Sequence, residues 1–403
     1  MELLTTTNGQ TSLPRYFAPV FDVTTRMARG RLDFVLPDGR RFRAEGTAPG
    51  PVAVLQVHNS DLFARLIREG DLGFCEAYVE GWWSSPDLQA FMDLVHADND
   101  ELYDGFPGLN LLRAFERLRF WIKSNSKRQA RKNIHAHYDL GNAFYRLWLD
   151  ETMTYSSAKF VTGQESLENA QIAKYASMID EMGAVPGDHV LEIGCGWGGF
   201  AEYAARERGL RITGLTISQA QHDYAVERMA KAGLSDRVEI KMQDYRDERG
   251  RYDGIASIEM FEAVGEKYWP TYFDMIRDRL NPGAHATLQI ITVQDRRWDV
   301  YRKGVDFIRK HIFPGGMLPS RGALLAEVER AGLRLARSVE FGDSYSQTLR
   351  RWHDTFNARW DDVAALGFDD RFRKMWNFYL TSCAATFRSG NCDVTQITVT
   401  NSG

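Results

Sequence analysis

The sequence predicts an α/β fold in which a doubly wound sheet follows a smaller α+β domain. Strand and helix patterns alternate from Asp180 onward, and a glycine-rich turn follows the first of these strands. Alternation of this kind forms right-handed βαβ units and a parallel sheet, whose ligands bind beyond the carboxyl ends of the strands. The length of 403 residues is enough for two domains.

The composition is typical of a globular protein of the reducing cytosol. Hydrophobic residues make up 44% and charged residues 26% of the chain. The net charge of −4 gives no basic field for a nucleic acid. The segment Met1–Pro14 has no apolar signal core, and no run of 18 apolar residues could cross a membrane. The cysteines lack metal-ligand spacing, so neither disulfides nor a metal site are expected; they are Cys75, Cys195, Cys383 and Cys392.

Residues 1–112 are predicted to form the smaller α+β domain. Two alternating segments flank Pro37-Asp38-Gly39, which is a strong hairpin turn. A third strand and a helix beginning after Ser60-Asp61 follow. The predicted elements are strands over Gly30–Leu36, Arg41–Gly46 and Val52–Val57, and a broken helical stretch over Glu76–Leu112.

Residues 113–132 are predicted to be a basic linker. They hold eight Lys or Arg residues and one acid, Glu116, with Leu118, Phe120, Trp121 and Ile122 between the charges. One interpretation is an interfacial segment that meets an anionic membrane surface, where each Lys or Arg contributes roughly 1 kcal/mol. The other is a solvated helix between two domains, and the sequence leaves both open.

Residues 133–403 are predicted to form the larger domain. Its expected strands are His189–Ile193, Arg211–Thr216, Val238–Gln243, Tyr252–Ile258 and Ala284–Thr292. Its expected helices are Phe200–Arg208, Gln219–Ala232 and Tyr268–Leu280, followed by helices rich in Trp, Phe and Arg over Thr348–Phe387.

The glycine-rich turn indicates a nucleoside site. Its spacing is G-x-G-x-G-G over Gly194–Gly199, which is neither the dinucleotide pattern nor a P-loop. Thr216 closes the second strand, where a dinucleotide site usually has an acid. Polar residues also end the other strands, so we expect them to line one pocket; they are Ser218, Gln221, Gln243, Asp244, Glu259 and Glu262.

Several motifs in order give the chain a family resemblance. It resembles the cyclopropane fatty acid synthase family of S-adenosylmethionine-dependent methyltransferases, including its branch that makes methyl-branched or furan fatty acid precursors. The resemblance spans about residues 60 to 390. Its carriers are His137–Tyr145, Met153–Phe160, Leu191–Gly199, Gly214–Ser218, Gln243–Asp247 and Ile312–Gly316.

The resemblance implies a Rossmann-like class I methyltransferase fold with an S-adenosylmethionine pocket. Tyr155 and Ser156 match positions that cover the methionine end, and Gly194 and Gly196 match those beside methionine and ribose. Thr216 and Gln221 match ribose-side contacts, while Gln243 and Asp244 match the adenine side. An aromatic face such as that of Tyr155 stabilises a nearby cation by about 0.5–2 kcal/mol. The alternative for Tyr155, without the resemblance, is an aromatic residue of the core.

The resemblance also implies methyl transfer to a carbon–carbon double bond of a phospholipid acyl chain. Such a reaction needs a site that stabilises a carbocation and a base that removes a proton. The resemblance implies that a bound bicarbonate acts as this base. The residues that hold the bicarbonate in the family match Ser157, Glu262, Gln289 and Tyr345 here. Ser157 replaces a cysteine and Gln289 a histidine.

Glu259 stands where the family usually has glycine, and two readings of it remain open. A second carboxylate near Glu262 should raise one pKa, which suits a general base. Otherwise Glu259 pairs with an arginine or binds the cofactor ribose. We expect the altered base to favour a methyl- or methylene-branched product over a cyclopropane.

Other functions remain as alternatives at this point. They are ring closure to a cyclopropane, methylation of a small soluble molecule, and non-catalytic lipid binding. We expect a cytoplasmic protein that is peripheral on the inner membrane surface. The sequence leaves the oligomeric state open, with a homodimer among the expected arrangements.

Overall fold

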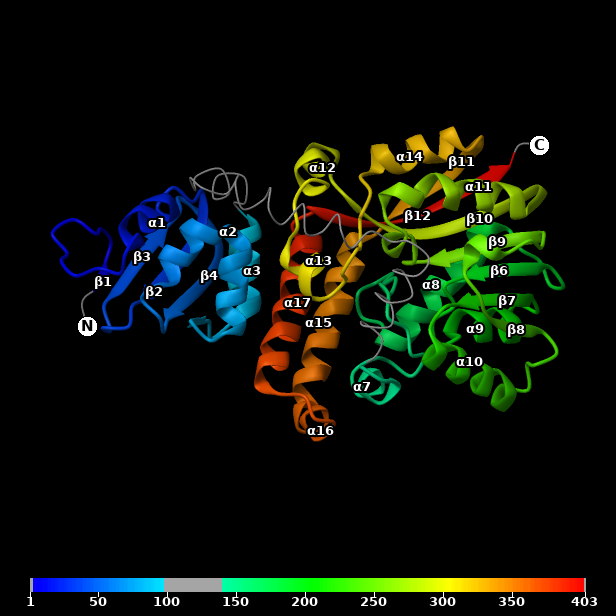
Figure 1. The fold of residues 1–403 in the computed structure, drawn as a ribbon, viewed down its shortest axis with the longest axis horizontal. Helices are drawn as coiled ribbons and strands as arrows, with labels where there is room; N and C mark the ends of the chain where they lie inside the picture. Colours follow the sequence, from blue (N-terminus) through cyan, green and yellow to red (C-terminus); the bar gives the residue numbers. More distant parts are fainter. Residues whose placement is uncertain (1–2, 98–139, 402–403) are drawn as a thin grey trace.

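The computed structural model describes residues 3–97 and 140–401. Two separate sheets organise these residues, and Figure 1 shows them on opposite sides of the helices α15 (Gly342–Ala358) and α17 (Asp370–Arg388). The predicted linker 113–132 and the predicted domain boundary at 112 lie outside the described residues.

The N-terminal sheet has five strands in the order β1-β3-β2-β4-β5. The predicted hairpin is present, because Phe34 pairs with Phe42 and the Leu36 amide donates to the Arg40 carbonyl at 2.9 Å. The third strand is longer than predicted and runs parallel to β2. The strands are β1 (Leu3–Leu4), β2 (Arg29–Val35), β3 (Arg41–Glu45), β4 (Ala48–Val57) and β5 (Trp83–Ser84).

Three helices accompany this sheet and join it to the rest of the molecule: α1 (Phe17–Thr24), α2 (Leu62–Val79) and α3 (Leu88–Ala97). Tyr78 of α2 contacts Phe378 of α17, with ring centroids 5.7 Å apart. The Glu76 carboxylate accepts from Lys310 at 2.7 Å and contacts His311 at 2.8 Å. Phe378 also belongs to the N-terminal hydrophobic core, so the two parts share a packed interface.

The second sheet has seven strands in the order β11-β12-β10-β9-β6-β7-β8, which confirms the predicted Rossmann-like sheet. The five predicted strands are present. Two strands were not predicted, and one of them, β12, runs antiparallel to both of its neighbours. The strands are β6 (His189–Ile193), β7 (Arg211–Thr216), β8 (Val238–Met242), β9 (Tyr252–Ile258), β10 (Leu280–Val293), β11 (Leu333–Glu340) and β12 (Cys392–Asn401).

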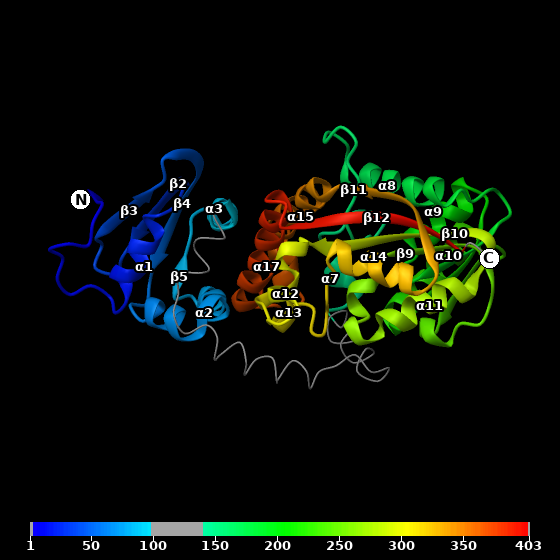
Figure 2. The same cartoon turned by 90° about the horizontal axis from the view of Figure 1, so that it is seen from above.

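Helices cover both faces of this sheet. Figure 2 shows α8 and α9 on one face and α11 and α14 on the other, the arrangement of a doubly wound fold. The remaining helical elements are α7 (Asn142–Arg146), α8 (Leu167–Met182), α9 (Gly199–Glu207), α10 (Gln219–Ala232), η1 (Tyr245–Asp247), η2 (Phe261–Ala263), η3 (Glu266–Tyr268), α11 (Trp269–Arg279), α12 (Asp295–Tyr301), α13 (Phe307–His311), α14 (Arg321–Arg330) and α16 (Trp360–Ala365).

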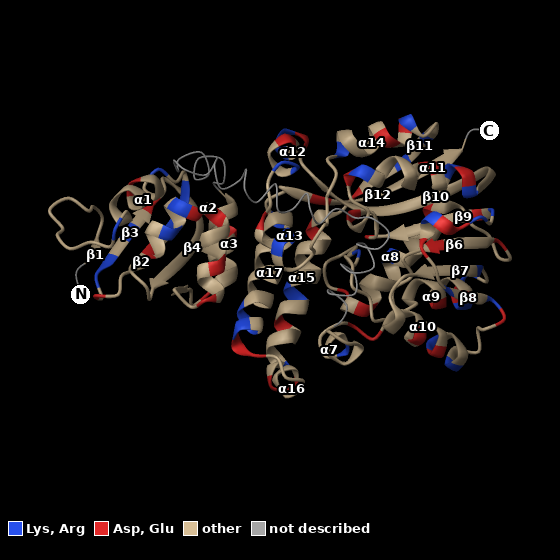
Figure 3. Ribbon diagram, viewed as in Figure 1, with Lys and Arg blue, Asp and Glu red and all other residues tan. Residues whose placement is uncertain are grey.

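Acidic and basic residues alternate over both parts of the described chain, as Figure 3 shows. Such a mixed surface agrees with the small net charge of −4. Within residues 3–97 and 140–401, every helix is too short or too polar to span a bilayer.

Candidate active site

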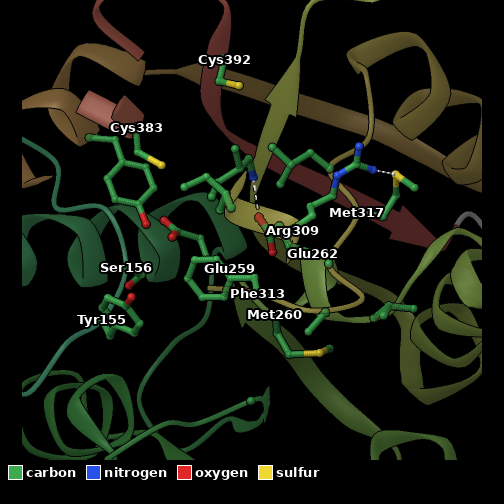
Figure 4. A pocket seen from close by; sticks show the side chains of 18 of the residues that line it. Tyr155, Ser156, Glu259, Met260, Glu262, Arg309, Phe313, Met317, Cys383 and Cys392 are labelled. Atoms are coloured by element: carbon green, nitrogen blue, oxygen red, sulfur yellow. Dashed lines mark hydrogen bonds between the residues drawn. The ribbon is translucent and has the colours of Figure 1, made fainter. Parts of the chain in front are cut away.

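A cavity of about 990 Å³ lies at the carboxyl ends of the central strands and extends to the N-terminal part, where Leu72 and Cys75 line it. All eight residues predicted for the cofactor line it: Tyr155, Ser156, Gly194, Gly196, Thr216, Gln221, Gln243 and Asp244. Of the five predicted catalytic residues, Glu259, Glu262 and Tyr345 line it. Ser157 and Gln289 are fully buried and lie behind its wall. Figure 4 shows Tyr155, Glu259, Glu262 and Phe313 around one space.

The glycine-rich turn leaves its backbone open to a ligand. Gly194 and Gly196 have φ of 81° and 53°, values that other residues rarely adopt. A Cβ on Gly194 would meet Met260 Cγ at 2.7 Å, whereas a Cβ on Gly196 would meet nothing within 4 Å. The turn therefore needs glycine for its shape and borders free space at Gly196.

Glu192, at the end of β6, is a site residue that the sequence analysis missed. Its carboxylate is 3% exposed and lines the cavity. Nothing among the described residues hydrogen-bonds its Oε2 atom. Burial raises the pKa of Glu192 to about 8, against the opposing charges of Lys174 and Arg228. A buried carboxylate of this kind suits a cationic ligand group such as the methionine ammonium.

The next two strands present a fixed polar wall. The Thr216 hydroxyl donates to Gln221 Oε1 at 2.9 Å. The Asp244 carboxylate accepts two hydrogen bonds from Arg246, at 2.8 and 2.7 Å, and one from the Arg246 amide. Gln243 donates to Glu248 at 3.0 Å. These contacts hold the amide and carboxylate groups at the cavity, where the donor and acceptor set fits a ribose and an adenine.

Tyr155 lies in a box of aromatic rings. Trp352, Tyr145 and Trp148 have ring centroids 5.3, 5.4 and 5.5 Å from that of Tyr155, and Phe313 stacks at 6.3 Å. The Tyr155 hydroxyl lies 2.9 Å from that of Tyr379. Aromatic faces stabilise cations, so this box suits a sulfonium and a developing carbocation.

Glu259 follows β9 directly and is held in one orientation. Its Oε1 accepts hydrogen bonds from the Ser157 amide and from Gln289 Nε2, both at 2.8 Å. The Tyr345 hydroxyl also hydrogen-bonds to its carboxylate. Within the described chain it forms no ion pair with an arginine, one of the two roles left open by the sequence. Its φ of 49° costs about 1–2 kcal/mol in a residue with a side chain.

Glu262, in η2, lines the same cavity as Glu259, but its carboxylate has fewer hydrogen-bond partners. Its Oε1 accepts from the Ile291 amide at 2.6 Å, and its Oε2 is buried without a partner among the described residues. Burial, and then the charge of Glu259, raise the pKa of Glu262 to about 8. Burial also raises the pKa of Glu259, but the charge of Lys174 and the hydrogen bonds from Gln289, the Ser157 amide and Tyr345 oppose that rise. The Glu259 carboxylate therefore has partners that favour its charged form, which Glu262 largely lacks.

The residues of the expected bicarbonate shell do not fit that anion here. The Ser157 amide, Gln289 and Tyr345 all hydrogen-bond to Glu259. From β10, Ile291 rather than Gln289 contacts Glu262. The Glu259 carboxylate thus occupies the donors that a bound anion would need.

Changing Glu192 to glutamine should weaken S-adenosylmethionine binding at least tenfold, because it removes a negative charge from a buried site that receives a cation. A cationic ligand favours the ionised form of Glu192, whose pKa is about 8 in the free protein. Affinity of the parent protein should therefore rise between pH 6 and 7.5, and Glu192→Gln should abolish that rise. Calorimetric titration at several pH values measures both effects; equal affinity in the two proteins would exclude Glu192 from the site.

Comparisons with known proteins show the family to which this chain belongs. The family model "Mycolic acid cyclopropane synthetase" matches residues 125–397. Tuberculostearic acid methyltransferase UfaA1 of Mycobacterium tuberculosis (strain ATCC 25618 / H37Rv) is 40% identical over 382 residues, which cover 92% of this chain and 88% of that protein. The cyclopropane-fatty-acyl-phospholipid synthase of Escherichia coli (strain K12) is 35% identical over 363 residues, with coverages of 87% and 88%.

A solved structure extends the agreement to the fold. Mycolic acid cyclopropane synthase CmaA1, complexed with SAH and CTAB, superposes with a TM-score of 0.63 and 30% identity over 67% of this chain and 97% of that one. Sequence and structure thus point to the same family. The chain belongs to the cyclopropane synthase family, and it is an S-adenosylmethionine-dependent methyltransferase.

Proposed function

We propose that this methyltransferase methylates a carbon–carbon double bond in an unsaturated acyl chain of a phospholipid, and that its favoured product is methyl- or methylene-branched. Methyl transfer to lipid acyl chains is the coarser activity that the family supports. The observation that carries the finer proposal is the Glu259 carboxylate, fixed by Ser157 and Gln289 beside the aromatic box. The relative at 40% identity is named for a branched acid, tuberculostearic acid.

When bound, S-adenosylmethionine supplies an electrophilic methyl group, so that a carbon–carbon bond forms from the alkene π electrons, the carbon–sulfur bond breaks and S-adenosylhomocysteine leaves. Tyr155 and its neighbouring rings stabilise the carbocation that remains on the acyl chain. Glu259 then accepts one proton, and the electron pair of the broken C–H bond neutralises the cation. No oxidant or reductant enters this balance for a methylene product.

The position of the base selects the product. Proton loss from the new methyl group with closure onto the cation gives a cyclopropane. A shift of the neighbouring hydride, followed by proton loss from the methyl carbon, gives a methylene branch. The Glu259 carboxylate is fixed to the protein, so it reaches a different C–H bond of the substrate from the one that a freely bound anion reaches. This difference supports the branched product. Ring closure is the second candidate, favoured by the 35% identity to the Escherichia coli synthase.

Mass spectrometry of acyl chains tests the proposed product. A host that contains monounsaturated phospholipids and expresses this protein should accumulate acyl chains that are heavier by CH₂ and carry a methylene branch. If a host enzyme reduces that branch, the acyl chains carry a methyl branch and are heavier by CH₄. Methyl-labelled methionine should place the label in that branch. A cyclopropane ring as the main product would overturn the proposal.

Two further expectations accompany this function. We propose peripheral binding to an anionic membrane surface, because the substrate is a lipid and the basic segment 113–132 offers charge for it. A homodimer is proposed only as an arrangement compatible with the sequence. Vesicle binding and solution mass measurements address these two points.

A further inference from the structure

A chain of hydrogen bonds leaves Glu259 on the side away from the cavity. Gln289 Nε2 donates to Glu259 Oε1 at 2.8 Å, and Gln396 Nε2 donates to Gln289 Oε1 at 3.0 Å. The two glutamines lie directly opposite each other on β10 and β12. They are 0% and 2% exposed, so their amides depend on protein partners.

The chain continues through α8 toward the surface. The Ser177 hydroxyl donates to Gln396 Oε1 at 2.7 Å, and Lys159 Nζ donates to the Ser177 oxygen at 2.6 Å. Lys159 is half-buried, with its ammonium 5.4 Å from the centre of the Phe341 ring. Three side chains, those of Gln289, Gln396 and Ser177, thus connect Glu259 with the Lys159 cation.

The two ends of this chain fix the direction of every hydrogen bond in it. An ammonium group and a backbone N–H can only donate. Because Lys159 donates to Ser177, the Ser177 hydroxyl donates onward, and each glutamine accepts through oxygen and donates through nitrogen. Gln289 therefore presents its NH₂ group to Glu259, whose Oε1 already accepts from the Ser157 amide. An oxygen with two N–H donors is best satisfied as part of a carboxylate.

We infer that Lys159, Ser177, Gln396 and Gln289 form a directional relay of hydrogen bonds that keeps Glu259 ionised and oriented as the proton acceptor of the reaction. This inference rests on the proposed role of Glu259 as the base. Ser177 and Gln396 are positioning residues, because both lie outside the lining of the cavity. If the direction of the relay reverses, Gln289 presents an oxygen to Glu259, and two facing oxygens need a proton between them.

Other charged and titratable groups also face Glu259. Lys174 from α8 is buried, and its charged form favours the Glu259 carboxylate, although burial lowers the pKa of Lys174 to about 7. Glu262 from η2 and the Tyr345 hydroxyl from α15 complete its surroundings. A substitution at Ser177 leaves Lys174, Glu262 and Tyr345 in place, so such a substitution isolates the contribution of the relay.

Ser177→Ala tests the relay through the pH profile of turnover. Without the hydroxyl, Gln396 Oε1 has no donor and the Gln396 amide can flip, so that only the Ser157 carbonyl, which accepts from Gln289 Nε2 at 3.2 Å, still holds the Gln289 NH₂ group toward Glu259. We expect the limb of the kcat profile that reports Glu259 to move up by at least about one pH unit, which is a tenfold change in proton affinity. Turnover should fall about tenfold at pH 6 and approach the parent value at high pH.

Two control variants separate this effect from a loss of packing. Ser177→Thr retains the hydroxyl and should restore the parent profile. Thr398 lies on β12 two residues from Gln396, and its hydroxyl hydrogen-bonds to that of Thr287 at 3.2 Å. Thr398→Val should therefore lower stability without moving the profile.

Glu259→Gln distinguishes a failure of the relay from a failure of the proposed function. If Glu259→Gln is inactive and Ser177→Ala keeps the parent profile, the relay is overturned and the base remains. If Glu259→Gln turns over normally, the proposed function is overturned, and the relay with it. If the pH profile shifts in Ser177→Ala, and the residual activity of the double variant Ser177→Ala/Glu259→Gln shows no such shift, the relay and the proposed role of Glu259 are both supported.

Discussion

Replacing Glu259 with glutamine should lower kcat by about 10²–10⁴-fold, the usual contribution of a general base. Glutamine has nearly the same size and can still accept from the Ser157 amide through its oxygen, but it cannot take a proton. Binding of S-adenosylmethionine should stay within a few-fold, because Glu259 lies outside the glycine-rich turn. Single-turnover kinetics with labelled cofactor, combined with calorimetry, measure the two quantities.

Glu259→Gly provides the matched experiment. Glycine adopts a φ of 49° without cost, so this variant should be as stable as the parent or more stable. It also frees the donors at Ser157, Gln289 and Tyr345 for a small anion. We therefore expect its lost turnover to be restored in part by added bicarbonate or formate, whereas Glu259→Gln, whose side chain fills the space, should not respond. Full turnover in either variant without added anion would remove Glu259 from the chemistry.

The sequence predicts the elements of this fold better than the contacts of its site. The bounds of β7, β9 and α10 agree with the predicted ranges, because apolar runs and caps such as Ser218 act locally. The strands β11 and β12 were missed. Apolar residues of β11 and β12 alternate with Thr, Arg and Ser. These segments become strands only through pairing, in which β12 lies between β11 and β10. Such pairing is a long-range property that local patterns do not report.

Side-chain partners in the site show the same limit. The motifs predict eight cofactor residues, and all eight line one cavity, because strand ends meet at one edge of a sheet. Which groups contact each other depends on tertiary structure. Gln289 supports Glu259 instead of Glu262, and Ile291, two residues along β10, contacts Glu262 through its backbone. Glu192 looked like part of a buried strand, although an acid in an apolar strand was a usable signal.

Changing Glu262 to alanine should abolish turnover, while S-adenosylmethionine binding stays within a few-fold. The carboxylate is fully buried at the cavity, and its Oε2 has no partner among the described residues, so it is available to a developing cation. Glu262→Gln keeps an acceptor for the Ile291 amide but carries no charge. If the loss in Glu262→Ala came only from a broken backbone contact, Glu262→Gln would recover activity; we expect it to remain inactive.

The pH profile of kcat/KM reports the state of Glu262 in the free enzyme. Burial holds the pKa of Glu262 near 8, so the charge that stabilises the cation forms only as the pH approaches that value. The parent enzyme should gain activity, up to tenfold per pH unit, as the pH rises toward 8, and the residual activity of Glu262→Gln should lack this limb.

The ionisation of Glu262 also affects the stability of the fold, with a defined sign. Because its folded pKa lies above its unfolded value, Glu262 stabilises the fold fully at acidic pH and loses that contribution as the pH rises through 8. Thermal unfolding of the parent should therefore shift to lower temperature between pH 6 and 9 by more than that of Glu262→Gln; equal shifts in both proteins would mean that Glu262 already carries its charge at neutral pH.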